Sequence, residues 1–237
     1  MSAGRFALIG GLTAALLLMF GAVVVSYRYV NQPTPSLSIA HHSLTQVHGY
    51  SAFSFDSART VNMAKASQTA ADRAIARFVD IEVSQALQDE PAGKSSTDCS
   101  KTSSRCGFFK QQLQEQSCSD EYFCLTQPVE WLPYRANDGH ASVSTLVIDK
   151  ATGNRVRLTD VVHADLQPDF LRKVRQDVAT QLGSAGTRAK DTPSDISIED
   201  ITSWLPLPGG IDVWFAKFAV APGALGVIRV HVPFAYV

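Results

Sequence analysis

The longest uninterrupted hydrophobic stretch of the chain lies close to its amino terminus. Phe6–Val25 is a run of 20 residues without a charge, in which Thr13 is the only ordinary polar side chain. A helix of this length rises about 30 Å, the thickness of the hydrocarbon core of a bilayer, and it satisfies its backbone hydrogen bonds internally, as lipid requires. With Arg5 before the run and Arg28 after it, the pattern predicts a transmembrane signal-anchor over residues 1–28.

A cleaved secretory signal is the alternative interpretation of the same run. Signal peptides usually have an apolar region of about 7–15 residues, followed by a small-x-small cleavage site. Val23–Tyr27 offers no such site, and Ser38–Ala40 lies too far downstream. We therefore expect an uncleaved single-pass anchor at the cell membrane, with five residues before the run and the carboxyl-terminal part extracytoplasmic. Cleavage would instead release a secreted protein.

A short polar segment follows the predicted anchor. Residues 29–49 contain two prolines and several small polar side chains, which predicts an extended juxtamembrane stalk. His41, His42 and His48 lie in this segment, but no acidic or cysteine side chain stands close to them in the sequence. We therefore expect no metal site there.

The remainder of the chain mixes strand and helix patterns. Apolar residues at helical spacing predict two amphipathic helices, one from Ser57 to about Leu87 and one from Pro168 to Gly183. Period-two alternation and turn residues predict strands at 49–55, 108–116, 122–131, 142–149, 155–158, 211–218 and 227–232. Because strands and helices do not alternate as regular βαβ units, we expect an α+β domain over 50–237, with a mainly antiparallel sheet and two packed helices.

All four cysteines, Cys99, Cys106, Cys118 and Cys124, lie within 26 residues of one another. An even number in an exported chain predicts two disulfides and an oxidising compartment. A zinc site is the alternative, but the spacings of 7, 12 and 6 lack the close Cys-x-x-Cys pairs of zinc modules. Three connectivities are possible, and we favour the sequential one, Cys99–Cys106 and Cys118–Cys124.

The charge balance and the motif content narrow the function classes. With 21 basic and 22 acidic residues, the chain has no basic footprint, so we expect no nucleic-acid partner. Hydrophobic residues make up 45% of the chain, which excludes wholesale disorder. A phosphate loop, a dinucleotide fingerprint, a His-Glu-x-x-His helix and a Gly-x-Ser-x-Gly elbow do not occur, so we expect no cofactor.

His140 and Ser142 are the candidate catalytic residues. Asp138 precedes His140 by two positions and Ser142 follows it by two, which brings the residue types of a hydrolytic triad together. A working triad needs convergence in space, which three residues so close in sequence rarely supply. A turn histidine that bonds to the local backbone is the simpler interpretation.

Trp214 and Phe218 are the candidate binding residues. Trp214 alternates with its neighbours on a predicted strand, so an open sheet face would expose an aromatic ring that can stack on sugar or anchor a protein. A helix that covers the face is the alternative. Asp212 is interpreted as a solvated acid, and His231 as sharing a solvated strand face with Arg229.

Two segments resemble a known family. Ile148–Val162 is similar to the Asp-x-x-Thr-Gly-Lys-x-x-x-Leu-x-Asp-Leu element of the DUF3298 (RsiV-like) domain. Gly210–Gly226 resembles the family's strand followed by a Tyr-Glu-Ile-Ala-Pro-Tyr-Ala-Ala-Gly turn, and Val232–Phe234 stands where the family has Ile-Pro-Tyr. Ala219 and Gly223 replace a Glu and a Tyr of that turn, so contacts made by those side chains are missing.

The family includes ectodomains of membrane-anchored anti-sigma factors that sense lysozyme, accessory domains of cell-wall deacetylases, and secreted MPT64-like extracytoplasmic proteins. The resemblance implies a bacterial, DUF3298-like α+β module, related to β-grasp folds and used mostly for binding. We therefore expect a membrane-anchored, non-catalytic envelope module for a cell-wall glycan or a protein such as lysozyme. The alternative function is a secreted or wall-bound, esterase-like hydrolase.

Overall fold

The computed structural model describes residues 33–44, 47, 49–88, 106–133, 136–184, 196–217, 219–220 and 225–236. Apart from the first three, these residues belong to one compact unit, Ser36–Val237. The anchor predicted over Phe6–Val25 lies outside the described residues. Within the described ranges, no helix is both long and apolar enough to cross a membrane.

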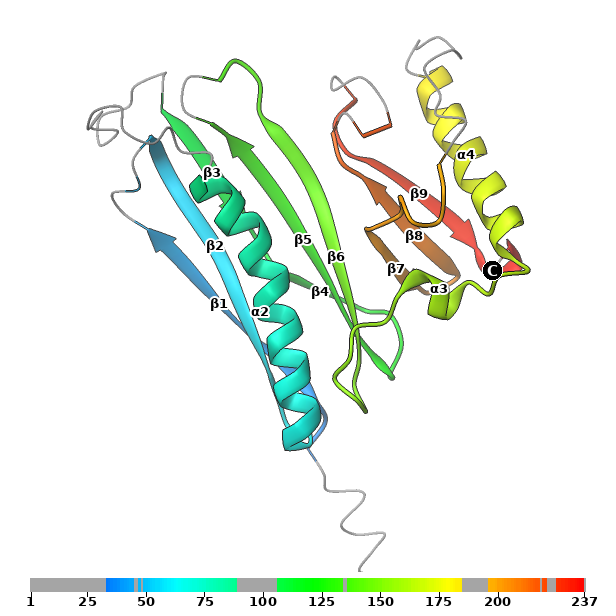
Figure 1. Ribbon diagram of the computed structural model, residues 1–237, viewed down its shortest axis with the longest axis horizontal. Helices are drawn as coiled ribbons and strands as arrows, with labels where there is room; N and C mark the ends of the chain where they lie inside the picture. Colours follow the sequence, from blue (N-terminus) through cyan, green and yellow to red (C-terminus); the bar gives the residue numbers. More distant parts are fainter. Residues whose placement is uncertain are drawn as a thin grey trace, which may run out of the picture. The chain divides into compact units, whose positions relative to one another are not determined.

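Six of the described strands form the larger of two sheets (Figure 1). They are β1 (Ser36–Leu44), β2 (Tyr50–Val61), β3 (Gly107–Gln111), β4 (Gln114–Gln116), β5 (Tyr122–Leu132) and β6 (His140–Asp149). β6 pairs along one edge of β5, and β3 and β4 share the other edge. β2 and β3 are parallel and the other neighbours are antiparallel, which confirms the mainly antiparallel prediction and adds one parallel pair.

Strand β1 corrects the predicted stalk over 29–49. Ser36–Leu44 pair antiparallel with β2 over nine consecutive residues, so this part of the segment belongs to the sheet. Side chains reinforce the pairing, since His41 Nδ1 lies 2.7 Å from an Asp56 carboxylate oxygen. The polar composition of the segment was misleading because an edge strand is held by its backbone and can leave nearly all its side chains in water.

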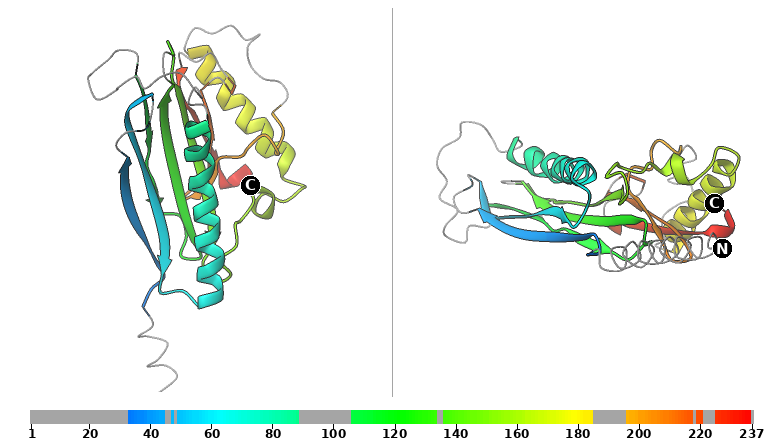
Figure 2. Two further views of the ribbon diagram at one scale, coloured as in Figure 1. Left: turned by 60° about the vertical axis from the view of Figure 1, so that its left-hand side comes forward. Right: turned by 90° about the horizontal axis from the view of Figure 1, so that it is seen from below.

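Helix α2 (Lys65–Gln88) connects β2 with β3 and covers one face of the larger sheet (Figure 2). Two apolar clusters lie beneath it. One comprises Ala71, Ile75, Phe123, Leu125, Leu146 and Ile148, and the other Tyr50, Phe53, Ala86, Phe109 and Val129. Between them, Gln127 is fully buried and Ser144 donates a hydrogen bond of 2.9 Å to Glu82. A polar layer therefore divides the packing under α2.

The helix does not begin at Ser57 as predicted, because β2 continues to Val61. The Thr60 backbone N–H and hydroxyl both donate to Asp72 of the helix, over 2.7 Å and 2.8 Å, and so tie the end of the strand to α2. Asn62 then adopts a φ of 63° and turns the chain, which delays the helix until Lys65. A good capping residue is thus a weak signal where a strand can continue.

The smaller sheet contains three antiparallel strands and is covered on one face by helix α4 (Gln167–Ser184). The strands are β7 (Trp204–Leu207), β8 (Gly210–Phe215) and β9 (Ile228–Pro233), followed by the 3₁₀ turn η3 (Phe234–Tyr236). β8, β9 and α4 confirm elements predicted from their periodicity, although α4 runs one residue past Gly183. The sequence patterns did not indicate β7.

Residues 155–158 do not form the predicted strand. A single bridge joins Arg155 to Ile148 in this stretch, and the short helix α3 (Leu158–Val161) follows. The helix starts here because the Asp160 carboxylate accepts the Arg157 backbone N–H over 2.9 Å, which caps its first turn. The described domain therefore contains a third, short helix besides the two long ones that were predicted.

One side chain of β6 links the two sheets. The Thr145 hydroxyl donates to the Trp204 carbonyl oxygen over 2.9 Å and accepts from the Trp204 N–H over 2.6 Å. Both residues are buried. The hydroxyl thus replaces, for one residue of β7, the pair of backbone hydrogen bonds that a neighbouring strand would make.

The disulfide between Cys118 and Cys124 confirms one of the two predicted bridges. It joins sulfur atoms 2.11 Å apart across the turn between β4 and β5. Cys106 is also disulfide-bonded, and Cys99 lies outside the described residues. Cysteines held in disulfides cannot ligate zinc as thiolates, which removes the zinc alternative for these residues.

Candidate functional site

The strongest concentration of functional side chains lies on the face of the smaller sheet opposite α4. Along β8, Ile211, Val213 and Phe215 point into the apolar core. Asp212 and Trp214 therefore lie on the other face. The register with β9 sets His231 beside Asp212 and Arg229 beside Trp214. We call these four residues the Asp212 cluster.

Asp212 is the buried centre of this cluster. Only 1% of its side chain is exposed, against 60% for Arg229 and 49% for His231. Arg229 Nε donates to one carboxylate oxygen over 2.6 Å and an Nη of the same side chain also reaches that oxygen. His231 Nδ1 lies 2.6 Å from the other oxygen. The interpretation of Asp212 as a solvated acid is therefore wrong: it is a buried anion that fixes two exposed groups.

Trp214 supports the arginine rather than standing free. Its side chain is half-buried, and the Arg229 guanidinium carbon lies 5.3 Å from the ring centroid, within cation–π range. The sequence allowed this face of the sheet to be either open to solvent or covered by a helix. Instead, the Arg229 guanidinium lies over Trp214. Phe218, the other candidate binding residue, lies outside the described residues.

The arrangement presents donors to solvent in a fixed geometry. A guanidinium has five N–H donors, and Asp212 occupies only those on its own side. The His231 ring turns Nδ1 to Asp212, so its Nε2 is the nitrogen left for a ligand. The exposed guanidinium donors are suited to binding a carboxylate or another anion by charge-assisted hydrogen bonds.

Replacing Gly210 with alanine should disturb this cluster. A Cβ there would lie 2.3 Å from the Val232 carbonyl oxygen and 2.8 Å from Cε1 of His231. The ring must move and the strands must separate locally. We therefore expect the His231 imidazole N–H resonance to disappear from ¹⁵N–¹H spectra, and the unfolding free energy to fall by about 1–3 kcal/mol. Gly183→Ala is the control, since nothing lies within 4 Å of its Cβ position. An unchanged His231 resonance in Gly210→Ala would contradict the prediction.

His140 and Ser142 lie on one face of β6, but no hydrogen bond joins them in the described structure. Ser142 is buried, and its Oγ has no hydrogen-bond partner there. His140 meets the ring of Trp131 edge-on, with centroids 6.3 Å apart. Asp138 pairs instead with Lys217 over 2.6 Å, and this hydrogen bond lowers the pKa of Asp138. The acid–base–nucleophile chain of a triad is therefore not assembled around His140.

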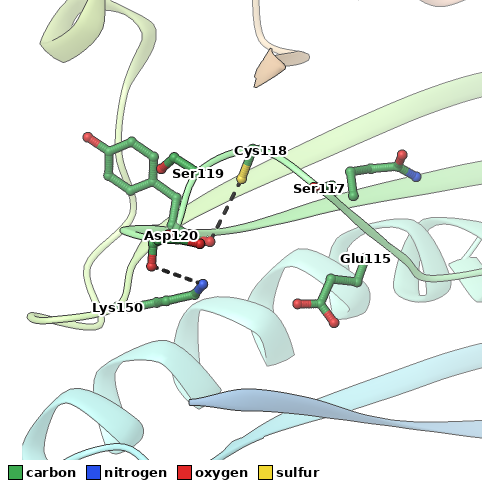
Figure 3. A pocket seen from close by; sticks show the side chains of 8 residues that line it. Glu115, Ser117, Cys118, Ser119, Asp120 and Lys150 are labelled. Atoms are coloured by element: carbon green, nitrogen blue, oxygen red, sulfur yellow. Dashed lines mark hydrogen bonds between the residues drawn. The ribbon is translucent and has the colours of Figure 1, made fainter. Parts of the chain in front are cut away.

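A polar pocket of about 570 Å³ lies by the disulfide turn (Figure 3). Its lining comprises Glu115, Gln116, Ser117, Cys118, Ser119, Asp120, Tyr122 and Lys150. Lys150 Nζ donates to the Asp120 carbonyl oxygen over 3.1 Å and lies 4.9 Å from the Phe123 ring centroid. The one lysine of the pocket is held by an exposed backbone carbonyl, whereas Arg229 of the Asp212 cluster is held by a buried carboxylate.

Comparison with known proteins bears on the fold. No protein-family model matches the sequence, and no curated protein matches it. A DUF3298 family structure from Pseudomonas aeruginosa PAO1 superposes with a TM-score of 0.58 at 10% identity, over 85% of this chain and 91% of that one. Another, from Bacteroides fragilis NCTC 9343, gives 0.54 at 11% identity, over 85% and 92%. The DUF3298-like architecture implied by the sequence resemblance is thereby confirmed.

Proposed function

We propose, from the DUF3298-like fold of this chain, that the protein is a membrane-anchored extracytoplasmic binding module without catalysis. The Phe6–Val25 helix would hold it at the membrane, and the Asp212 cluster would bind a carboxylate-bearing cell-wall ligand. A protein ligand such as lysozyme is the competing outcome. The disulfides support the location, because such bonds persist in oxidising compartments outside the cytoplasm.

The buried carboxylate of Asp212 carries the proposal. Burying an ion pair is a weak way to stabilise a fold, since well-packed apolar residues do as well or better. Here the buried carboxylate orients Arg229 and His231, whose side chains are 60% and 49% exposed. An arginine that is fixed by a buried acid and lies against an aromatic ring keeps most of its N–H donors available. It has already lost much of its rotamer freedom, so little more is lost when a ligand binds. This favours ligand binding as the reason for the arrangement.

The exposed groups fit the chemistry of cell-wall polymers. Peptide-bearing glycans carry carboxylates, which match the planar donor fork of Arg229. His231 leaves its Nε2 for a ligand, and the uncovered part of Trp214 offers apolar contact to a sugar ring. The exposed N–H donors of Arg229 thus favour an acidic ligand.

The test is binding of soluble peptidoglycan fragments to the full chain in detergent, measured by calorimetry. Arg229→Gln should weaken binding about tenfold or more, since a charge-assisted bidentate contact is lost, while Arg229→Lys should fall between. The matched control is Arg157→Gln, which removes another exposed arginine paired with an aspartate, Asp160. Circular dichroism checks that each variant is folded.

Other outcomes would contradict the proposal in distinguishable ways. An equal loss in Arg157→Gln would show non-specific charge attraction. Binding of lysozyme without binding of fragments would favour the protein ligand. Turnover of a chromogenic short-chain ester that Ser142→Ala abolishes would favour the hydrolase.

A further inference from the structure

We propose that the free edge of β1 is an association surface, on which the β1 strand of a second copy of this chain pairs antiparallel. Among the described strands, β1 ends the strand order of the larger sheet and pairs with β2 on one side only (Figure 1). About half of its backbone N–H and C=O groups therefore point away from β2. This inference is independent of the ligand assigned to the Asp212 cluster.

The edge lacks the features that usually prevent strand addition. Natural sheets protect their edges with short strands, lysines, prolines, bulges or a covering element. β1 is nine residues long, contains no proline, lysine, arginine or acid, and keeps an unbroken register with β2. Eight of its nine residues are exposed, with Leu37 the exception. None of these protections is present in the described strand.

β1 is also held firmly enough to act as a template. Besides its ladder with β2, it is fixed by two cross-strand side-chain contacts at its centre. His41 Nδ1 lies 2.7 Å from an Asp56 carboxylate oxygen, and His42 Nε2 lies 2.7 Å from the Ser57 hydroxyl. The His42 ring further stacks on Phe55 at 4.9 Å. Because β1 is already ordered, it loses little further conformational entropy when another strand pairs with it.

The composition of the edge favours a second copy as the occupant. Antiparallel pairing of identical strands about a two-fold axis closes after two copies and needs no second surface. With no Lys, Arg, Asp or Glu in β1, and His41 already beside an acid, such pairing meets no strong like-charge repulsion. The formal net charge of −1 leaves little repulsion between whole chains. Ile39 and Leu44, 41% and 42% exposed, would be partly covered.

Sedimentation equilibrium of the full chain in detergent tests this pairing. The wild type should show a monomer–dimer equilibrium. Ala40 is the exposed central residue of β1, so full antiparallel overlap about a two-fold axis places it opposite its own copy. Ala40→Lys and Ala40→Glu should each weaken association by about tenfold or more, because like charges then face one another across the strands. An equimolar mixture of the two variants should restore it. Ala76→Lys, at an exposed position of α2, is the control and should associate like the wild type.

Two results would overturn pairing through β1. A wild type that stays monomeric at its highest soluble concentration overturns the proposal, and so does undiminished association of both Ala40 variants. If a variant does not fold, amide hydrogen exchange of the wild type answers instead. Exchange of those β1 amides that point away from β2 should slow as the protein concentration rises, and concentration-independent exchange would overturn the proposal.

Discussion

Replacing Gly153 with alanine should destabilise the folded domain by about 3 kcal/mol or more. Gly153 has a φ of +75°, and a Cβ there would lie 1.9 Å from the carbonyl oxygen of Ser67 and 2.7 Å from its carbonyl carbon. Those atoms belong to the first turns of α2, whose backbone cannot yield as a side chain can. The helix must lift from the turn that follows β6, which would also break the 2.6 Å hydrogen bond from the Ser67 hydroxyl to Ala151. Urea unfolding measures the loss.

Gly209→Ala separates the two causes of this effect. Gly209 has a φ of +93°, but nothing lies within 4 Å of its Cβ position. Gly209→Ala should therefore lower the unfolding free energy by only about 1 kcal/mol, the conformational cost of a left-handed backbone for alanine. An equal loss in the two variants would mean that close approach to α2 contributes nothing at Gly153.

Thr145→Val should cost about 2–4 kcal/mol of unfolding free energy, the second large effect. Valine has the same shape but lacks the hydroxyl, so the Trp204 N–H and carbonyl oxygen lose the partner that they have in β6. Leaving buried backbone groups unsatisfied costs more than the net value of the bonds themselves. Chemical denaturation measures the change, and hydrogen exchange should show the Trp204 amide opening before the core of either sheet.

Thr145→Ser is the matched control, since it retains the hydroxyl and removes only a methyl group. Its loss should stay close to 1 kcal/mol, the value of one buried methyl group. A loss in Thr145→Ser that equals or exceeds the loss in Thr145→Val would contradict the prediction, because the hydroxyl would then contribute no more than the methyl group.

Elements with strong periodicity could be predicted from the sequence. The period-two pattern of β9 and the apolar spacing of α4 both reflect burial of one face against a core, and burial is what a hydrophobic pattern records. β1 lacks such a pattern because nearly all its side chains stay in water. β7 was missed because it is four residues long and contains Pro206, which is tolerated where a strand edge meets only a side chain.

The candidate site could be predicted only in part. The alternation around Trp214 identified the right strand, and the shared face of Arg229 and His231 is confirmed. The role of Asp212 was not accessible, because its partners lie 17 and 19 residues away and meet it only through the β8–β9 register. A carboxylate flanked by the apolar residues Ile211 and Val213 was the one signal available in the sequence.

The parallel pairing of β2 with β3 has a consequence for how the chain is made. β2 is complete at Val61, but the strand that occupies its inner edge begins at Gly107, after the whole of α2. During synthesis at roughly 5–20 residues per second, that edge stays open for a few seconds, while β1 has already paired on the other side. Within this interval α2 can shield the face of the nascent hairpin but not its edge. We therefore expect misassembly during translation, where it occurs, to begin with foreign strands that pair at the Tyr50–Ser54 end of β2, the position that β3 later fills.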